Sequence, residues 1–203
     1  PPSVFIGYDS RINSRTFAEE AAKVLAGNGI RVYIFEDIRP TPFVSFGCRY
    51  KKCISAIMIT ASHNPAIYNG YKVYWEDGGQ ILPPHDTKII EQVNLIQDPS
   101  QVKMIDNLHH PLIEWVGSGI DEAYFQAIAP LQNNQKENQQ FGSSLKVVYT
   151  SLHGTGITVM PKALSNWGFT NVSLVEKQVI PDGHFPTVSY PNPEEKAALQ
   201  MGI

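Results

Sequence analysis

The stretch Val4-Phe5-Ile6-Gly7-Tyr8-Asp9-Ser10-Arg11 sets the pattern from which the fold of this 203-residue chain can be predicted. Its first five residues are apolar enough to form a short buried strand, and the next three form a turn. Phe17, Ala21 and Val24 then recur at helical spacing, and residues 31–35 return to a strand-like run. A strand, a helix and a second strand in this order predict the opening of an α/β domain.

The same alternation continues along the chain. It predicts helices near 41–52, 86–96 and 120–128, strands at 56–60 and 71–75, and an irregular stretch over 98–118. The fold class expected is α/β, with a layered, mixed, largely parallel sheet flanked by helices. Because only a short loop joins the strands at 56–60 and 71–75, we expect that pair to be antiparallel.

A polar stretch divides the chain. Residues 131–144 carry almost no apolar side chains and are predicted to form a linker or surface loop, with a boundary near 140. Residues 1–140 are then a first domain. Residues 141–203 begin a second, similar α/β domain, with strands near 145–149 and 172–175 around a helix at 159–167.

Composition limits the partners. The net charge is only -3 and 17% of residues are charged, which gives no general electrostatic reason to bind nucleic acid or an acidic membrane surface. Apolar runs are far shorter than the roughly 20 residues that cross a bilayer. Cys48 and Cys53 match neither a CxxC pair nor a zinc site, so we expect two reduced helix thiols in a cytoplasmic protein.

The sharpest local motif is Thr60-Ala61-Ser62-His63-Asn64-Pro65, which directly follows an apolar strand. Ligands of open α/β sheets bind beyond the carboxyl ends of the strands, and Asn-Pro forces a turn there. Ser62 would therefore lie on an exposed loop, with Arg11 and Lys72 as nearby cations for a phosphate. A serine hydrolase is disfavoured because the G-x-S-x-G elbow is absent. The residues alone leave two readings open: a phosphate-handling loop, or a turn whose polar side chains satisfy backbone groups.

These motifs resemble those of a known family. The segments TASHNP (60–65) and NGYK (69–72) resemble the phosphoserine signature of the phosphohexomutases, the phosphoglucomutase/phosphomannomutase family. Residues 7–11 resemble the family's G-x-D-x-R loop, and residues 150–156 resemble the opening loop of its second domain. FPTV (185–188) and YPNPEE (190–195) resemble a subgroup that contains phosphopentomutases and glucose-1,6-bisphosphate synthases.

The resemblance implies an intramolecular phosphotransferase that interconverts sugar 1-phosphates and sugar 6-phosphates through a phosphoserine and a bisphosphate intermediate. The roles that it implies are phosphoryl carrier for Ser62, general acid/base for Lys72, proton transfer or phosphate orientation for His63, and phosphate binding for Arg11 and Asn64. It also implies Mg²⁺, contacted here only through the Ser62 phosphate, with glucose 1,6-bisphosphate as activator.

The family pattern extends beyond this chain. The family has four domains, and its aspartate-rich metal loop, sugar-binding loop and distal phosphate-binding loop do not occur in these 203 residues. We therefore expect an N-terminal fragment of a longer protein, inactive in isolation. A phosphopentomutase, a glucose-1,6-bisphosphate synthase and a folded phosphate-binding module remain alternatives. His153, on the loop at 150–156, is open between an interdomain contact and a role in loop shape.

Overall fold

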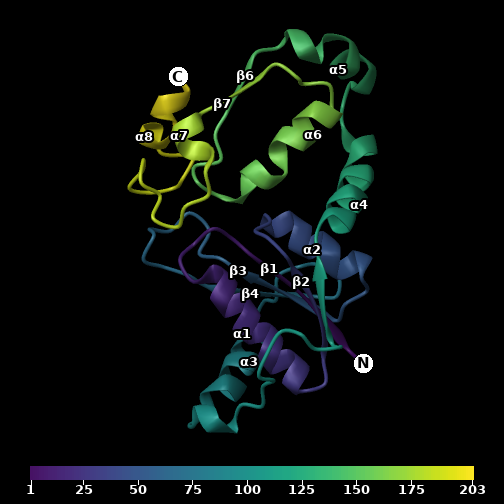
Figure 1. Cartoon of the computed structure of the whole chain (residues 1–203), viewed down its shortest axis with the longest axis vertical. Coiled ribbons are helices and arrows are strands. Elements are labelled where there is room, and N and C mark those ends of the chain that lie inside the picture. The colour runs from purple at the N-terminus through teal and green to yellow at the C-terminus, as the bar shows by residue number, and fades with distance from the viewer.

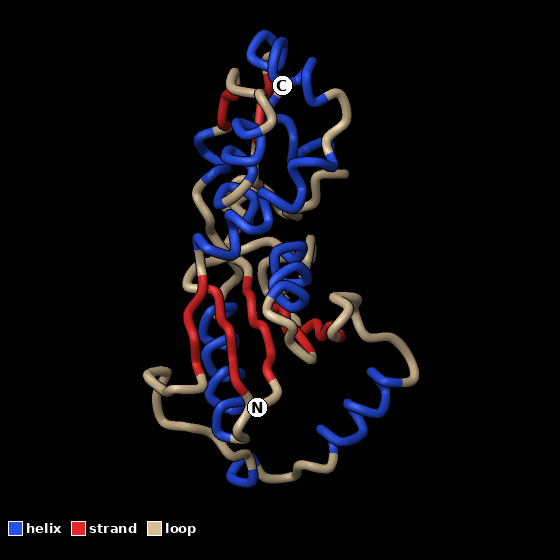
Figure 2. Tube along the Cα trace, turned by 90° about the vertical axis from the view of Figure 1, so that its right-hand side faces the viewer, coloured by secondary structure: helices blue, strands red, loops and turns tan.

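The computed structural model describes residues 1–203 and has two lobes stacked along its long axis (Figures 1 and 2). The N-terminal lobe, residues 1–128, contains a five-stranded sheet of order β4-β3-β1-β2-β5. Its strands are β1 (Ser3–Tyr8), β2 (Arg31–Phe35), β3 (Ser55–Ile59), β4 (Tyr71–Trp75) and β5 (Ile113–Val116). β4 pairs antiparallel with β3 and all other pairs are parallel, which confirms the predicted fold class.

Helices cover both faces of this sheet. α1 (Ser14–Gly27) buries Ala18 and Ala22 against one face, together with Ile6 and Ile34 of the strands. α2 (Thr41–Tyr50) covers the opposite face, where Phe43 packs with Phe5, Phe35 and Met58. α4 (Ser118–Ile128) extends this second layer, because the Tyr124 ring stacks on Phe43 with centroids 4.0 Å apart. Because β1 and β3 are parallel neighbours, their carboxyl ends lie side by side at the same end of the sheet.

The C-terminal lobe, residues 135–203, is smaller and more open. Its core element is a parallel pair of strands, β6 (Val147–Tyr149) and β7 (Val172–Leu174). The helices of this lobe are α5 (Gln135–Phe141), α6 (Met160–Asn166), α7 (Glu176–Val179) and α8 (Lys196–Leu199). Short 3₁₀ turns occupy Pro99–Gln101, Ala129–Leu131, Gly142–Ser144, Thr155–Thr158 and Gln200–Gly202.

Two stretches predicted to be irregular are ordered. Residues 98–118 contain β5, whose Ile113–Val116 segment pairs with the edge of β2; four residues give too short a period to reveal a strand in the sequence. Residues 131–144 contain α5, where Gln139 Nε2 donates a hydrogen bond of 3.0 Å to the Asn166 carbonyl. That contact places α5 with the C-terminal lobe, so it favours a boundary somewhat before residue 140.

The helix predicted near 86–96 is present, and the two cysteines are unbridged as predicted. α3 (His85–Asn94) is present, but none of its residues is buried. Helix α1 begins at Ser14, whose hydroxyl donates a hydrogen bond of 2.7 Å to Asp9 Oδ1. Cys48 and Cys53 are both buried and unbridged, but only Cys48 lies on a helix. None of the helices is both long and apolar enough to cross a bilayer.

Candidate active site

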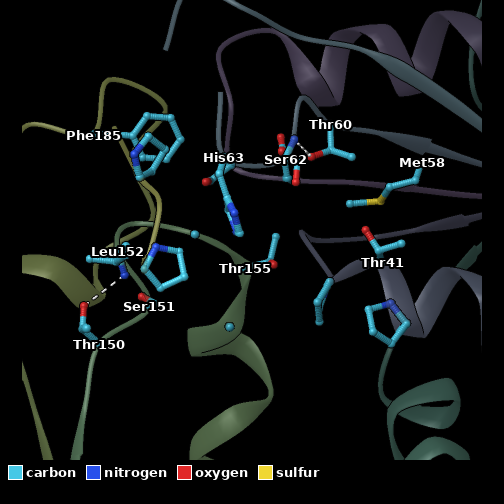
Figure 3. A pocket seen from close by; sticks show the side chains of 18 of the residues that line it. Thr41, Met58, Thr60, Ser62, His63, Thr150, Ser151, Leu152, Thr155 and Phe185 are labelled. Carbon is cyan, nitrogen blue, oxygen red and sulfur yellow. Dashed lines mark hydrogen bonds between the residues drawn. The ribbon is translucent and has the colours of Figure 1, made fainter. Parts of the chain in front are cut away.

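The β3–β4 loop presents Ser62 as predicted, on an exposed turn at the carboxyl end of β3. Ser62 has a positive φ of 55°, in the left-handed region that a non-glycine residue rarely adopts. Its N–H donates a hydrogen bond of 2.9 Å to Thr60 Oγ1, drawn as a dashed line in Figure 3. Held outliers of this kind cost about 1–3 kcal/mol and cluster at functional sites.

Arg11 holds this loop through hydrogen bonds from its guanidinium group. Nη1 donates to the carbonyl oxygens of Pro65 (2.9 Å) and Tyr68 (3.0 Å), and Nη2 donates to those of Ser62 (2.8 Å) and Asn64 (2.5 Å). The residue is 4% exposed, and burial lowers its pKa while the neighbouring Asp9 carboxylate raises it. Arg11 therefore fixes the shape of the loop through four backbone carbonyls. Direct contact with a phosphate on Ser62 stays a prediction.

A second loop of similar construction faces the first. Thr150 follows β6, and its Oγ1 accepts a hydrogen bond of 3.0 Å from the N–H of Leu152, two residues later. Leu152 and His153 both have positive φ, 47° and 62°. Both loops have a threonine followed by two residues and a histidine. In each loop the threonine hydroxyl accepts a nearby backbone N–H, so the same local chemistry bends both loops at the carboxyl ends of their strands (Figure 3).

The loops enclose a cavity of about 380 Å³ between the lobes. It is lined mainly by polar groups and prolines: Asp9, Ser10, Pro40, Thr41, Pro42, Met58, Thr60, Ser62, His63, Tyr149, Thr150, Ser151, Leu152, Gly154, Thr155, Gly156, Phe185, Pro191 and Pro193. The His63 ring projects into this space beside Ser62 (Figure 3). A cavity of this size and polarity suits a small hydrophilic ligand.

Three of the predicted site residues, Arg11, Lys72 and Asn64, do not line the cavity. Lys72 lies on β4 opposite Met58, on the same face of the sheet, and is partly buried without a hydrogen bond or ion pair. Asn64 is exposed; its N–H donates 3.1 Å to Ala61 and its carbonyl accepts from Arg11. The structure thus brings Ser62 and His63 together in the cavity, whereas Lys72 stands on the adjoining strand.

His153 is 2% exposed and its ring stays within the C-terminal lobe. Nδ1 lies 3.0 Å from the Ile180 carbonyl oxygen, and Nε2 lies 2.9 Å from Thr187 Oγ1. His153 contacts the N-terminal lobe through its backbone, because Ser10 Oγ donates a hydrogen bond of 2.8 Å to the His153 carbonyl. Both expected roles of His153, loop shape and interdomain contact, therefore have a structural counterpart.

The chain does not contain a cluster of three or more histidine, cysteine, aspartate or glutamate side chains placed to hold a metal ion. Mg²⁺ takes near-octahedral oxygen coordination. The side chains present therefore do not make a Mg²⁺ site by themselves.

Family models match nearly the whole chain. Phosphoglucomutase/phosphomannomutase α/β/α domain I matches residues 1–99, and α/β/α domain II of the same family matches residues 122–203. The chain belongs to the phosphoglucomutase/phosphomannomutase family. The family resemblance drawn from TASHNP and NGYK is thereby confirmed.

Individual relatives agree. A phosphoglucomutase of Staphylococcus haemolyticus is 40% identical over 203 residues, covering 100% of this chain and 36% of that protein. A human phosphopentomutase is 38% identical, covering 98% of this chain and 34% of its own length. A crystal structure of a phosphoglucomutase/phosphomannomutase family protein from Burkholderia thailandensis has the same fold, with a TM-score of 0.73 at 21% identity over 100% of this chain and 41% of that one. The chain thus spans about a third to two fifths of the length of these relatives.

The structure places two further residues at the site, Thr60 and Phe185, that the sequence did not single out. Thr60 was seen only as part of a motif, although its hydroxyl bends the loop, and Phe185 was seen only as part of FPTV, although its ring lines the cavity. A threonine two residues before the serine was an available signal, since such hydroxyls bond nearby backbone N–H groups. Phe185 gave no local signal, because it approaches Ser62 only through the packing of the lobes.

Proposed function

We propose that these residues form the phosphoserine half of a sugar-phosphate mutase that interconverts sugar 1-phosphates and sugar 6-phosphates. The observation that carries the proposal is the strained, exposed Ser62 at the mouth of a polar cavity between the lobes. Membership of the phosphoglucomutase/phosphomannomutase family supports the same function.

In the proposed reaction Ser62 carries the phosphoryl group. A hydroxyl of the sugar monophosphate attacks the phosphorus, the bond between phosphorus and Ser62 Oγ breaks, and a sugar bisphosphate forms. The attacking hydroxyl loses its proton to a base, and Ser62 Oγ gains a proton. The bisphosphate then reverses its orientation in the cavity. The reverse transfer returns its other phosphoryl group to Ser62, which completes the isomerisation. Such transfers depend mainly on positioning and charge stabilisation.

Two residues are candidates for the proton transfers. His63 projects into the cavity beside Ser62, which puts an imidazole near the reacting hydroxyl. Lys72 stands one strand away, without an internal partner, and the family resemblance favours it as the general acid/base. The proposal therefore gives Lys72 the proton transfer and gives His63 orientation of the phosphate or a share in proton transfer. Asn64 is proposed to fix the loop and to bind phosphate together with Arg11.

Mg²⁺ and glucose 1,6-bisphosphate are the proposed cofactor and activator. A bound Mg²⁺ would neutralise charge on the transferring phosphoryl group. Its remaining oxygen ligands would have to come from outside these 203 residues, and no step above is assigned to it. The two buried, unbridged cysteines favour a reducing compartment, so we place the protein in the cytoplasm.

Two alternatives have specific support. The 38% identity to a human phosphopentomutase favours a pentose phosphate or a bisphosphate-synthase activity within the same chemistry. The missing cluster of metal ligands favours a chain that binds phosphate without turnover when isolated. A panel of hexose and pentose 1-phosphates assayed on the full-length protein separates the first alternative from the main proposal.

The decisive experiment combines mass spectrometry with kinetics on the full-length protein. We expect one phosphoryl group, mapped to Ser62, and loss of nearly all mutase activity in Ser62→Ala. Ser100→Ala, at an exposed 3₁₀ turn far along the chain, is the matched control. Wild-type activity in Ser62→Ala, with phosphate on another residue, overturns the proposal.

A further inference from the structure

Phe185 of the C-terminal lobe covers Arg11, which holds the β3–β4 loop (residues 60–70). This loop carries Ser62 and is called the phosphoserine loop below. The Arg11 guanidinium carbon lies 5.1 Å from the centroid of the Phe185 ring. Phe185 is 5% exposed and has a positive φ of 50°, which is unusual for a bulky side chain. The Phe185 ring therefore packs against one face of the guanidinium, while the N–H groups at the edge of the guanidinium bind the loop carbonyls.

The backbone around Phe185 reaches the N-terminal lobe as closely as glycine allows. A Cβ on Gly183 would lie 2.5 Å from the Ile12 nitrogen and 2.9 Å from the Arg11 carbonyl carbon. No real Cβ tolerates such separations, so Gly183 lets this segment sit directly on the Ser10–Ile12 turn. Ser10 Oγ adds a hydrogen bond to the His153 carbonyl beside it.

His153 holds the Phe185 segment from both of its ends. Ile180 precedes the segment and Thr187 ends it, and the imidazole contacts both. Because a carbonyl oxygen only accepts, Nδ1 carries a proton, and the Thr187 hydroxyl, which can donate or accept, pairs with Nε2. The His153 carbonyl also accepts from the Asp182 N–H at 3.0 Å, which closes the turn before Phe185.

We propose that Phe185, held in place by His153, is a positioning residue for the phosphoserine loop and acts through Arg11. The chain of contacts runs from the imidazole to the 180–187 segment, from its Phe185 ring to Arg11, and from Arg11 to the Ser62 and Asn64 carbonyls. The C-terminal lobe thereby sets the geometry of the residue that carries phosphate. This role rests on the proposed mutase function only for its catalytic consequence; the structural coupling stands independently.

Hydrogen exchange on the 203-residue chain tests the coupling without any activity. Phe185→Leu keeps apolar bulk and removes the aromatic face, and we expect amide exchange across residues 61–70 to accelerate about tenfold, in line with a desolvated cation–π contact. Phe185→Tyr keeps the ring and should restore slow exchange. Phe185→Gly suits the positive φ better than phenylalanine does. If the residue served only the backbone, glycine would leave the loop protected, whereas the proposal expects it to exchange faster.

A double-mutant comparison tests whether Phe185 acts through Arg11. In an Arg11→Lys background, Phe185→Leu should add less than about twofold to the exchange rate, because coupled residues are not additive. Phe141→Ala, an exposed ring of the same lobe, should leave residues 61–70 unchanged. Unchanged exchange at 61–70 in Phe185→Leu and Phe185→Gly overturns the proposal, as does an undiminished effect in the Arg11→Lys background.

Kinetics on the full-length protein then separate this role from the function itself. For Phe185→Leu we expect kcat to fall about tenfold with KM within about twofold, and Phe185→Tyr to recover the rate. Altered exchange in a protein that never phosphorylates Ser62 would leave the coupling standing and remove the mutase proposal. A larger change in KM than in kcat would mean that Phe185 binds the sugar phosphate and would contradict a positioning role.

Discussion

Nη2 of Arg11 donates a hydrogen bond of 2.8 Å to the carbonyl oxygen of Ser62, the residue proposed to carry the phosphate. The same guanidinium binds three further carbonyls of the loop, while Nε lies 3.5 Å from the Asp9 carboxylate. A planar group with donors fixed at both ends can satisfy four diverging acceptors at once. The left-handed bend at Ser62 turns its carbonyl toward that group, so the bend and the guanidinium depend on each other.

Arg11→Lys should therefore destabilise the protein although charge is kept. A lysine ammonium is a point donor that cannot span four carbonyls, so buried acceptors lose their partners. We expect the free energy of unfolding to fall by about 2–3 kcal/mol in urea titrations. Arg15→Lys is the matched control, because Arg15 is an exposed partner of Glu19 and such pairs contribute about 0–1 kcal/mol. Equal losses in both variants would contradict the role given to Arg11.

The sequence predicted where Arg11 lies but not what it binds. A strand followed by a polar turn places Arg11 and Ser62 at the same sheet edge, since parallel strands end together. Which atoms face each other depends on the dihedral angles of the β3–β4 loop, and Asn64-Pro65 predicts only that a turn is present. β5 was missed for a related reason: four residues carry almost no periodicity, and they form a strand only because β2 offers an unpaired edge. The α5 helix likewise makes a contact that lies far away in the sequence, because Gln139 donates a hydrogen bond to the carbonyl of Asn166, 27 residues further on.

Thr60→Val should loosen the β3–β4 loop, which presents Ser62, without changing the size of the side chain. Thr60 Oγ1 accepts the Ser62 N–H, and valine leaves that N–H without its partner. We expect kcat of the full-length protein to fall about tenfold, the equivalent of one lost hydrogen bond of about 1–1.5 kcal/mol. Thr60→Ser keeps the hydroxyl and should retain most activity, while Thr170→Val, at an exposed loop position, should change nothing. Full activity in Thr60→Val would show that the bend at Ser62 does not need this bond.

Asp121→Asn should weaken the attachment of α4 to the N-terminal lobe. Arg39 Nε and Nη2 donate to the two carboxylate oxygens at 2.8 and 2.7 Å, and the hydrogen bond to Asp121 raises the Arg39 pKa. Asparagine offers one acceptor in place of two and removes the carboxylate paired with the nearly buried Arg39 guanidinium. We expect a loss of about 3 kcal/mol in the free energy of unfolding, measured in urea. Glu122→Gln, one residue further along α4 and without a basic partner, should lie within about 0.5 kcal/mol of wild type.

Tyr8→Phe should be neutral or stabilising at pH 7, and it should change stability at high pH. The Tyr8 hydroxyl is buried without a hydrogen-bond partner, and burial raises its pKa from 10.0 to about 12. Because the fold disfavours the phenolate, stability holds below pH 10 and falls between pH 10 and 12, by up to about 1.4 kcal/mol per pH unit for each such group. Denaturant titrations at pH 9, 10 and 11 should show a shallower decline in Tyr8→Phe than in wild type. Tyr190→Phe, at an exposed ring, should leave the decline unaltered, and so would Tyr8→Phe if its phenolate were tolerated in the fold.

The 203-residue chain by itself should show no appreciable mutase turnover, even with Mg²⁺ and glucose 1,6-bisphosphate. It has the loop with Ser62 and the cavity beside it, but no cluster of side chains placed to hold a metal ion. Without groups that grip the sugar and its distal phosphate, the reacting hydroxyl is not held in line, and positioning supplies roughly 7–11 kcal/mol of a barrier. Losing half of that, roughly 3.5–5.5 kcal/mol, lowers the rate by roughly 400- to 10,000-fold. A coupled assay of glucose 6-phosphate formation from glucose 1-phosphate compares the rate of this chain with that of the full-length protein, which is the positive control.

Circular dichroism of the same sample should show a folded chain, because the five-stranded sheet and both of its covering layers lie within residues 1–128. A rate within about tenfold of the full-length protein would show that residues 1–203 hold the whole catalytic apparatus, and that the metal and the sugar are bound by groups other than those proposed.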